Sequence, residues 1–215
     1  MRAASSDGRI RPVTAELRLF LDALAADDPT AAGRLLDAAP GLARESLGEG
    51  ASRADAAPHF VEGLERHAFA GDTALHFAAA AYRAELIGRL VAGGADVEAR
   101  NRRGATALHY ASVGDPRSPR WDPKAQAGAI AALIAAGADP NAVDRSGASP
   151  LHRAVRTRCA AAVQALLAGG ADRGLATKNG SSPARLAAVT SGRSGSGSAE
   201  ARAQQAQILR LLGER

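Results

Sequence analysis

The stretch Gly104-Ala105-Thr106-Ala107-Leu108-His109-Tyr110-Ala111 returns in three other places along the chain. Close copies lie at residues 71–78 and 147–154, and a more divergent copy lies at residues 180–187, so the spacings are 33, 43 and 33 residues. A second marker, Gly-Ala-Asp, recurs at residues 94–96, 137–139 and 170–172 with the same last two spacings. Both markers place ten extra residues in the middle unit, between Thr106 and Gly137.

Apolar residues at helical spacing follow each copy of the first marker. A Gly-Gly pair such as Gly93-Gly94 then ends the second helix of a unit, because glycine tolerates the left-handed conformation. A single helix pair cannot bury its apolar stripe, whereas stacked pairs can. In the first unit the two stripes are Leu75, Ala78 and Ala79, then Leu86, Ile87, Leu90 and Val91.

The period of 33 residues, with its Thr-Ala-Leu-His and Ser-Pro-Leu-His cores, resembles the ankyrin repeat, whose core is Thr-Pro-Leu-His-x-Ala. The resemblance covers about residues 68–215. It implies an all-α fold, an ankyrin-repeat α-solenoid of stacked helix-turn-helix units with short finger loops. We expect four repeats preceded by an N-terminal helical pair.

The expected organisation follows from these markers and from the composition of the intervening segments. Residues 1–13 are expected to be a flexible N-terminus, 14–46 a capping helical pair, and 47–67 an irregular connection with a short helix near residues 60–64. The repeats are expected at 68–100, 101–143, 144–176 and 177–215. The second contains an insertion at 115–124, whose three prolines are expected to stop it from extending the helix. The fourth contains a Gly/Ser-rich loop at 191–198.

Composition limits the compartment and the kind of core. The chain has 54 alanines but only 3% aromatic residues, which suits helices packed through small side chains. Its single cysteine cannot close an internal disulfide, and no secretory signal or membrane span is expected. We therefore expect a cytoplasmic protein. The Ala/Arg/Gly-rich composition favours a bacterial origin and a small standalone ankyrin-repeat protein.

The repeated histidines invite a metal or acid–base interpretation, but their spacing argues against it. Packed helices lie roughly 8–10 Å apart, whereas zinc ligands lie about 2.0–2.3 Å from the metal. The resemblance implies instead that each histidine and the nearby hydroxyl hold the turn by local hydrogen bonds. These structural residues are Thr73, His76, Thr106, His109, Ser149 and His152.

No other pattern predicts catalysis. The recurring Asp96, Asp139 and Asp172 are one repeat apart and suit turns, and His59 and His67 lack zinc-site spacing. Cys159, near the start of a second helix, is interpreted as a small residue in a turn rather than a reactive thiol. We predict no catalytic, cofactor-binding or metal-binding residue, and hence no enzyme and no cofactor.

Partner recognition is expected at the finger loops and the concave face, which repeat solenoids use for binding. The fingertips are basic, and the chain carries 27 Lys and Arg against 22 Asp and Glu, a net charge of +5. An acidic protein surface is the partner that this charge favours. The candidate residues are Phe69, Asp72, Tyr82, Arg102, Arg103, Trp121, Arg145, Arg156 and Lys178.

Trp121 lies in the insertion and is the single tryptophan of the chain. Two interpretations remain open: an exposed anchor flanked by basic residues, as in many binding hot spots, or a side chain packed on a neighbouring repeat.

The resulting hypothesis is a monomeric, non-enzymatic protein–protein interaction module. A regulator or immunity partner of an enzyme or toxin is an alternative. A nucleic-acid-binding protein is a weaker alternative, because acidic residues are interspersed, aromatics are few and no DNA-binding motif occurs.

Overall fold

The computed structural model describes residues 14–52, 54–188 and 199–213. The expected flexible segment 1–13 and the Gly/Ser loop 191–198 lie outside these residues. The helices are α1 (Ala15–Ala25), α2 (Pro29–Ala38), α3 (Ala74–Ala80), α4 (Ala84–Ala92), α5 (Ala107–Ala111), α6 (Pro123–Ala135), α7 (Pro150–Arg156), α8 (Ala160–Ala168), α9 (Pro183–Ala188) and α10 (Ala199–Leu212).

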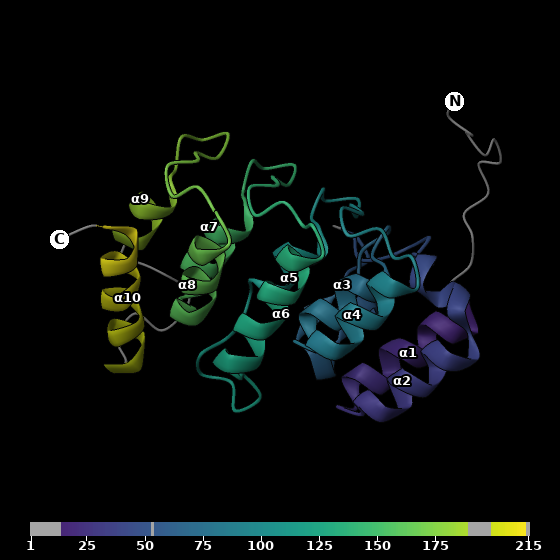
Figure 1. Cartoon of the computed structure of the whole chain (residues 1–215). Helices are drawn as coiled ribbons and strands as arrows, with labels where there is room; N and C mark the ends of the chain where they lie inside the picture. The colour runs from purple at the N-terminus through teal and green to yellow at the C-terminus, as the bar shows by residue number, and fades with distance from the viewer. Residues whose placement is uncertain (1–13, 53, 189–198, 214–215) are drawn as a thin grey trace.

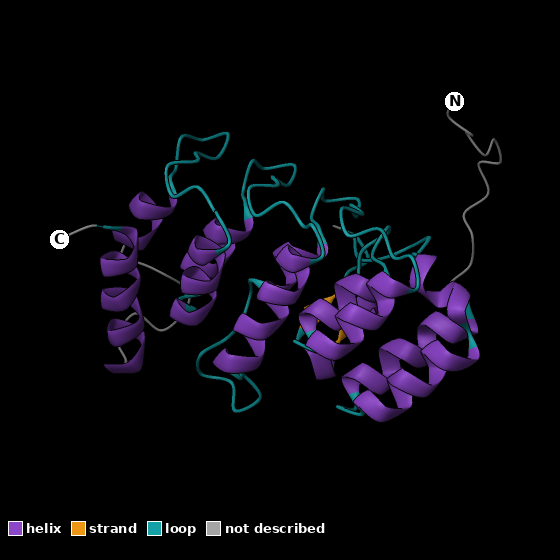
Figure 2. Cartoon of the chain, in the orientation of Figure 1, coloured by secondary structure: helices purple, strands orange, loops and turns teal. Residues whose placement is uncertain are grey.

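Helix pairs stack side by side into an elongated solenoid with two layers (Figure 1). The first helices α1, α3, α5, α7 and α9 contact one another in sequence, and the second helices α2, α4, α6, α8 and α10 form the other layer. Long loops project from the ends of the first helices on one side of the stack (Figure 2). One apolar cluster runs through the stack from Leu17 in α1 to Leu212 in α10.

Small side chains let the first helices pack closely. Every residue of α3 and of α5 is buried, because both layers and both neighbouring repeats cover these short helices. Alanine makes up half of their residues, so the backbones can approach without a bulky core.

Residues 60–64 form the expected short helix only in part, since Glu62–Leu64 is a 3-10 helix and Phe60–Val61 is a strand. Phe60–Val61 (β1) and Arg66–His67 (β2) pair antiparallel, and a 3-10 turn, Glu62–Leu64, joins them. The turn packs tightly on the end of α1: a Cβ on Gly63 would lie 2.0 Å from the carbonyl oxygen of Ala25. The helix is shorter than expected because Phe60 and Val61 pair with His67 and Arg66 instead of continuing it.

The insertion also differs from the expectation at its C-terminal end. Pro123 is the first residue of α6, and Asp122 caps it by accepting from the backbone N–H of Lys124 and of Ala125. Proline is tolerated at this position because its missing N–H would have no intrahelical partner. The insertion therefore lengthens the second helix: α6 has 13 residues, while α4 and α8 have nine each.

None of the described helices is long and apolar enough to span a bilayer.

Candidate functional site

The finger loops are tied to one another by their backbones. Arg102 donates its N–H to Ala70 (2.7 Å), Arg145 donates to Arg103 (2.9 Å), and Lys178 donates to Ser146 (3.2 Å). Each bond joins one finger to the finger before it. The three basic residues thus occupy the same position in three successive fingers, and we call them the basic ladder.

Each finger is closed by a side chain at its base. Asn101 Oδ1 accepts from the N–H groups of Arg103 and Ala105, and Asp144 Oδ1 accepts from those of Ser146 and Ala148. These bonds hold the turn that presents the ladder, so the fingers are ordered before any partner arrives.

The repeated histidines fasten each repeat to the next. His109 Nδ1 accepts from the N–H of Thr106 (3.1 Å), and its Nε2 lies 3.0 Å from the carbonyl oxygen of Ala148 in the following repeat. His76 and His152 make the equivalent contacts, to Ala105 and Ser181 at 3.1 and 3.0 Å. A carbonyl only accepts, so Nε2 carries the proton and the ring is neutral.

Burial is the main cause of the altered histidine titration. It lowers the pKa of His109 to about 3, with the positive charge of Arg153 acting in the same direction. Burial also lowers the pKa values of His76 and His152. Three neutral imidazoles in separate repeats, each with both nitrogens hydrogen-bonded, have no free lone pair for a metal. Among the described residues, no group of His, Cys, Asp and Glu is arranged to hold one.

The basic side chains of the fingers are exposed and lack carboxylate partners. Within the described residues, no carboxylate oxygen lies within 4 Å of the nitrogens of Arg102, Arg103, Arg145, Arg156 or Lys178. All five are exposed. The half-buried Phe69 lies beneath two of them, with the guanidinium carbons of Arg102 and Arg103 at 5.9 and 5.1 Å from its ring centroid.

Asp144, at the base of the second finger, is paired with an arginine. Asp144 Oδ2 accepts from Arg153 at 2.8 Å. Burial would raise the pKa of Asp144, but hydrogen bonds from Arg153 and Ser146 outweigh it and hold the pKa below its usual range. For Arg156, burial lowers the pKa, and the positive charges of Arg153 and Arg103 act in the same direction.

Asp72 is not on the surface, contrary to its selection as a candidate binding residue. Its side chain is fully buried and accepts from the N–H of Phe69, from Asn101 Nδ2 and from the hydroxyl of Tyr110, at 2.7, 2.8 and 2.7 Å. Burial raises the pKa of Asp72, partly offset by His76 and by these donors. Three donors from two repeats converge on the carboxyl, so it joins repeats and is inaccessible to a partner.

Tyr82 and Trp121 lie at the opposite ends of the first helices from the fingers. The half-buried Tyr82 donates its hydroxyl to the carbonyl of Val113 (2.5 Å), and burial raises its pKa to about 12. The indole of Trp121 is half-buried over Gly114 and donates Nε1–H to Gln126 (2.8 Å). The geometry favours the packed interpretation of Trp121 over the exposed anchor.

Cys159 is buried at the start of α8. Burial raises the pKa of its thiol, which disfavours the reactive thiolate.

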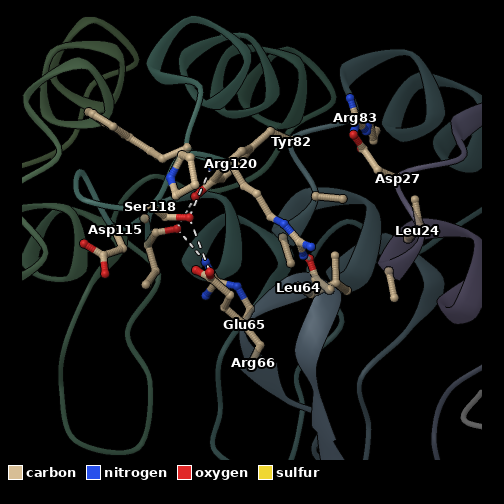
Figure 3. A pocket seen from close by; sticks show the side chains of 18 of the residues that line it. Leu24, Asp27, Leu64, Glu65, Arg66, Tyr82, Arg83, Asp115, Ser118 and Arg120 are labelled. Carbon is tan, nitrogen blue, oxygen red and sulfur yellow. Dashed lines mark hydrogen bonds and ion pairs between the residues drawn. The ribbon is translucent and has the colours of Figure 1, made fainter.

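A cavity of about 800 Å³ opens beside Tyr82 and Trp121 (Figure 3). Its walls come from the end of α1, the β1–β2 hairpin, the end of α3 and the insertion. Arg66 and Arg120 line it. Arg120 is one of the basic residues expected to flank Trp121, whereas the sequence did not single out Arg66. They come from segments about 50 residues apart, and no local pattern indicates that they meet.

Two known protein families match parts of this chain. The family described as "Ankyrin repeat" matches residues 70–102, and the family described as "Ankyrin repeats (many copies)" matches residues 133–187. The chain is an ankyrin-repeat protein. The prediction of an all-α ankyrin solenoid is confirmed. No curated protein matches the chain. Ankyrin repeats are generally protein–protein interaction modules and are typically non-enzymatic.

Proposed function

We propose that this ankyrin-repeat protein is a monomeric, non-enzymatic module that binds an acidic surface of a protein partner through its fingers and concave face. The basic ladder, Arg102, Arg145 and Lys178, is the observation that supports the proposal. It places one uncompensated cation at the same position of three successive fingers, with Arg103 and Arg156 beside it.

The ladder suits an acidic partner for two physical reasons. Unpaired cations in a row create a positive field, which accelerates the encounter with a negative surface and weakens as salt is added. Backbone bonds between fingers hold the ladder in place, so binding costs little ordering of the loops.

Charge reversal tests this assignment. The variant Arg102→Glu/Arg145→Glu/Lys178→Glu retains the backbone bonds between the fingers. The control, Arg18→Glu/Arg34→Glu/Arg210→Glu, makes the same change of charge at exposed positions on α1, α2 and α10. A partner is first identified by affinity capture with the unaltered protein, and both variants are then titrated against it at 50 and 300 mM salt.

The ladder variant should bind the partner at least about tenfold more weakly at low salt, with a smaller dependence on salt, while the control binds nearly normally. Equal affinities for the two variants would contradict the proposal. Loss of a partner enzyme's activity on binding would identify the regulator or immunity role. Sequence-preferring DNA binding that survives physiological salt would favour the nucleic-acid alternative instead.

The proposal includes a bacterial, cytoplasmic setting, as the composition suggests. The oligomeric state is tested by light scattering: a monomer has a mass of 21.8 kDa, and a stable dimer would contradict that part.

A further inference from the structure

The cavity beside Tyr82 and Trp121 lies where the first helices α1 and α3 end. Arg66, on its wall, places its guanidinium carbon 5.8 Å from the ring centroid of Tyr110, a residue of the inner helix α5. The fingers precede the first helices, whereas the cavity is lined by residues that follow α1 and α3.

Hydrogen bonds join two segments that are distant in sequence, and together these segments form one wall of the cavity. Arg66 Nη2 donates to the carbonyl of Val113 (2.5 Å), Arg120 Nη1 donates to that of Gly63 (3.2 Å), and Ser118 Oγ donates to Glu65 (3.3 Å). Figure 3 shows these side chains converging from the hairpin and from the insertion. These three hydrogen bonds hold the wall of the cavity together.

The carboxylates on the wall already have partners. Asp27 pairs with Arg83, and Asp115 is held by Arg117 through two hydrogen bonds of 3.1 and 3.0 Å. The third, Glu65, accepts from Ser118. Two of the three negative charges are thus compensated by arginines.

The two remaining arginines are uncompensated. Among the described residues, no carboxylate oxygen lies within 4 Å of Arg66 or Arg120. The Nε atom of Arg66 is buried without a hydrogen-bond partner among the described residues, which is a costly state for a donor. Two cations against the charge of Glu65 leave a net charge of +1, which one negative group would balance.

We propose that this cavity receives the free C-terminal carboxylate of a peptide chain, held by Arg66 and Arg120. A carboxylate offers the paired acceptor oxygens that guanidinium groups bind best. A cavity of this volume holds a ligand of several residues' size rather than one side chain. The inference rests on the proposed function, because the chain end belongs to the protein partner.

Trp121 provides a direct readout, because it lines the cavity and is the single tryptophan. Its indole N–H gives one NMR cross-peak. The probes are a mixed-sequence pool of acetylated pentapeptides with free C-termini and the same pool amidated at the C-terminus. Both pools contain Glu and Asp, so acidic side chains are matched.

The free-acid pool should shift the Trp121 cross-peak in a saturable manner, and the amidated pool should bind roughly tenfold or more weakly. Arg120→Gln, at an exposed position, and Arg66→Lys should each weaken binding about tenfold, while the finger variant Arg145→Gln should bind normally. Equal shifts with both pools, or no saturable shift with the free acids, would overturn the assignment.

The partner titrations with the ladder variant separate the two proposals. If the ladder governs partner affinity while the pools and Arg120→Gln show nothing, the cavity proposal alone is wrong. If the pools bind as expected but the ladder variant binds the partner normally, the acidic-surface proposal alone is wrong.

Discussion

The first three repeats and the fourth repeat begin their first helices in different ways. His76, His109 and His152 each contact a carbonyl of the next repeat, whereas Arg185, at the equivalent position of the fourth, is exposed. The fourth repeat keeps its local cap, since Ser182 Oγ still accepts from the N–H of Arg185. A hydroxyl therefore suffices to begin the helix, and the imidazole is needed to join one repeat to the next.

The largest expected effect of this difference is the response to acid. His76, His109 and His152 are neutral when folded because burial lowers their pKa values, to about 3 for His109, whereas an unfolded histidine titrates near pH 6.5. Below that pH the unfolded chain binds more protons than the folded chain does. The free energy of unfolding should therefore fall as the pH is lowered below 6.5, by about 1.4 kcal/mol per pH unit for His109, and His76 and His152 should act in the same direction. The raised pKa of Asp72 acts in the opposite sense near pH 4 and offsets part of the loss.

Urea denaturation between pH 7 and pH 4.5 measures this slope. His109→Gln should reduce it by about 1.4 kcal/mol per pH unit, whereas Arg185→Gln should leave it unchanged. A slope that is the same in His109→Gln and the unaltered protein would show that the buried imidazole is not the proton acceptor.

At neutral pH the same two positions should differ in their contribution to stability. His109→Ala removes the acceptor for the Thr106 N–H and the donor to the Ala148 carbonyl, both of them buried, so it should cost about 2–4 kcal/mol of unfolding free energy. Arg185→Ala, on the surface, should change it by less than about 0.5 kcal/mol. Urea midpoints at pH 7.5 give both values, and similar costs would contradict the inter-repeat role.

Asp72 extends the comparison to a carboxylate that occurs in one repeat only. Its equivalents are Ala105 in the second repeat, Ala148 in the third and Ser181 in the fourth. Asp72→Ala would leave Asn101 and Tyr110 without their acceptor in the interior, at a cost of about 1–3 kcal/mol. Asp72→Asn keeps one acceptor oxygen and should cost less. An unchanged urea midpoint in Asp72→Ala would mean that the network does not support the fold.

The sequence predicted the features that recur and missed several contacts between segments that occur only once. Gly, Thr or Ser, and His at fixed spacing placed the paired helices of the repeats and their fingers. Asp72 looked like a fingertip residue because nothing local reveals that Tyr110, from the next repeat, donates to it. The hairpin at Phe60 and the cavity arginines depend on contacts between segments 47 to 57 residues apart, which periodicity cannot indicate.

The smallest expected effect is a difference in stability between alanine substitutions at two glycines of the same motif. Gly147 and Gly180 are both left-handed, with φ of 82° and 72°, so alanine at either position should cost about 1 kcal/mol in backbone strain. A Cβ on Gly147 would also lie 2.7 Å from the backbone nitrogen of Lys178 in the next finger, whereas one on Gly180 would meet nothing within 4 Å. Gly147→Ala should therefore be the more destabilising by roughly a further 1 kcal/mol. It should also weaken binding of the acidic partner, because the displaced backbone carries Lys178 of the ladder. Equal urea midpoints for the two variants would show that the fingers adjust freely, in which case the ladder is not held in place before binding.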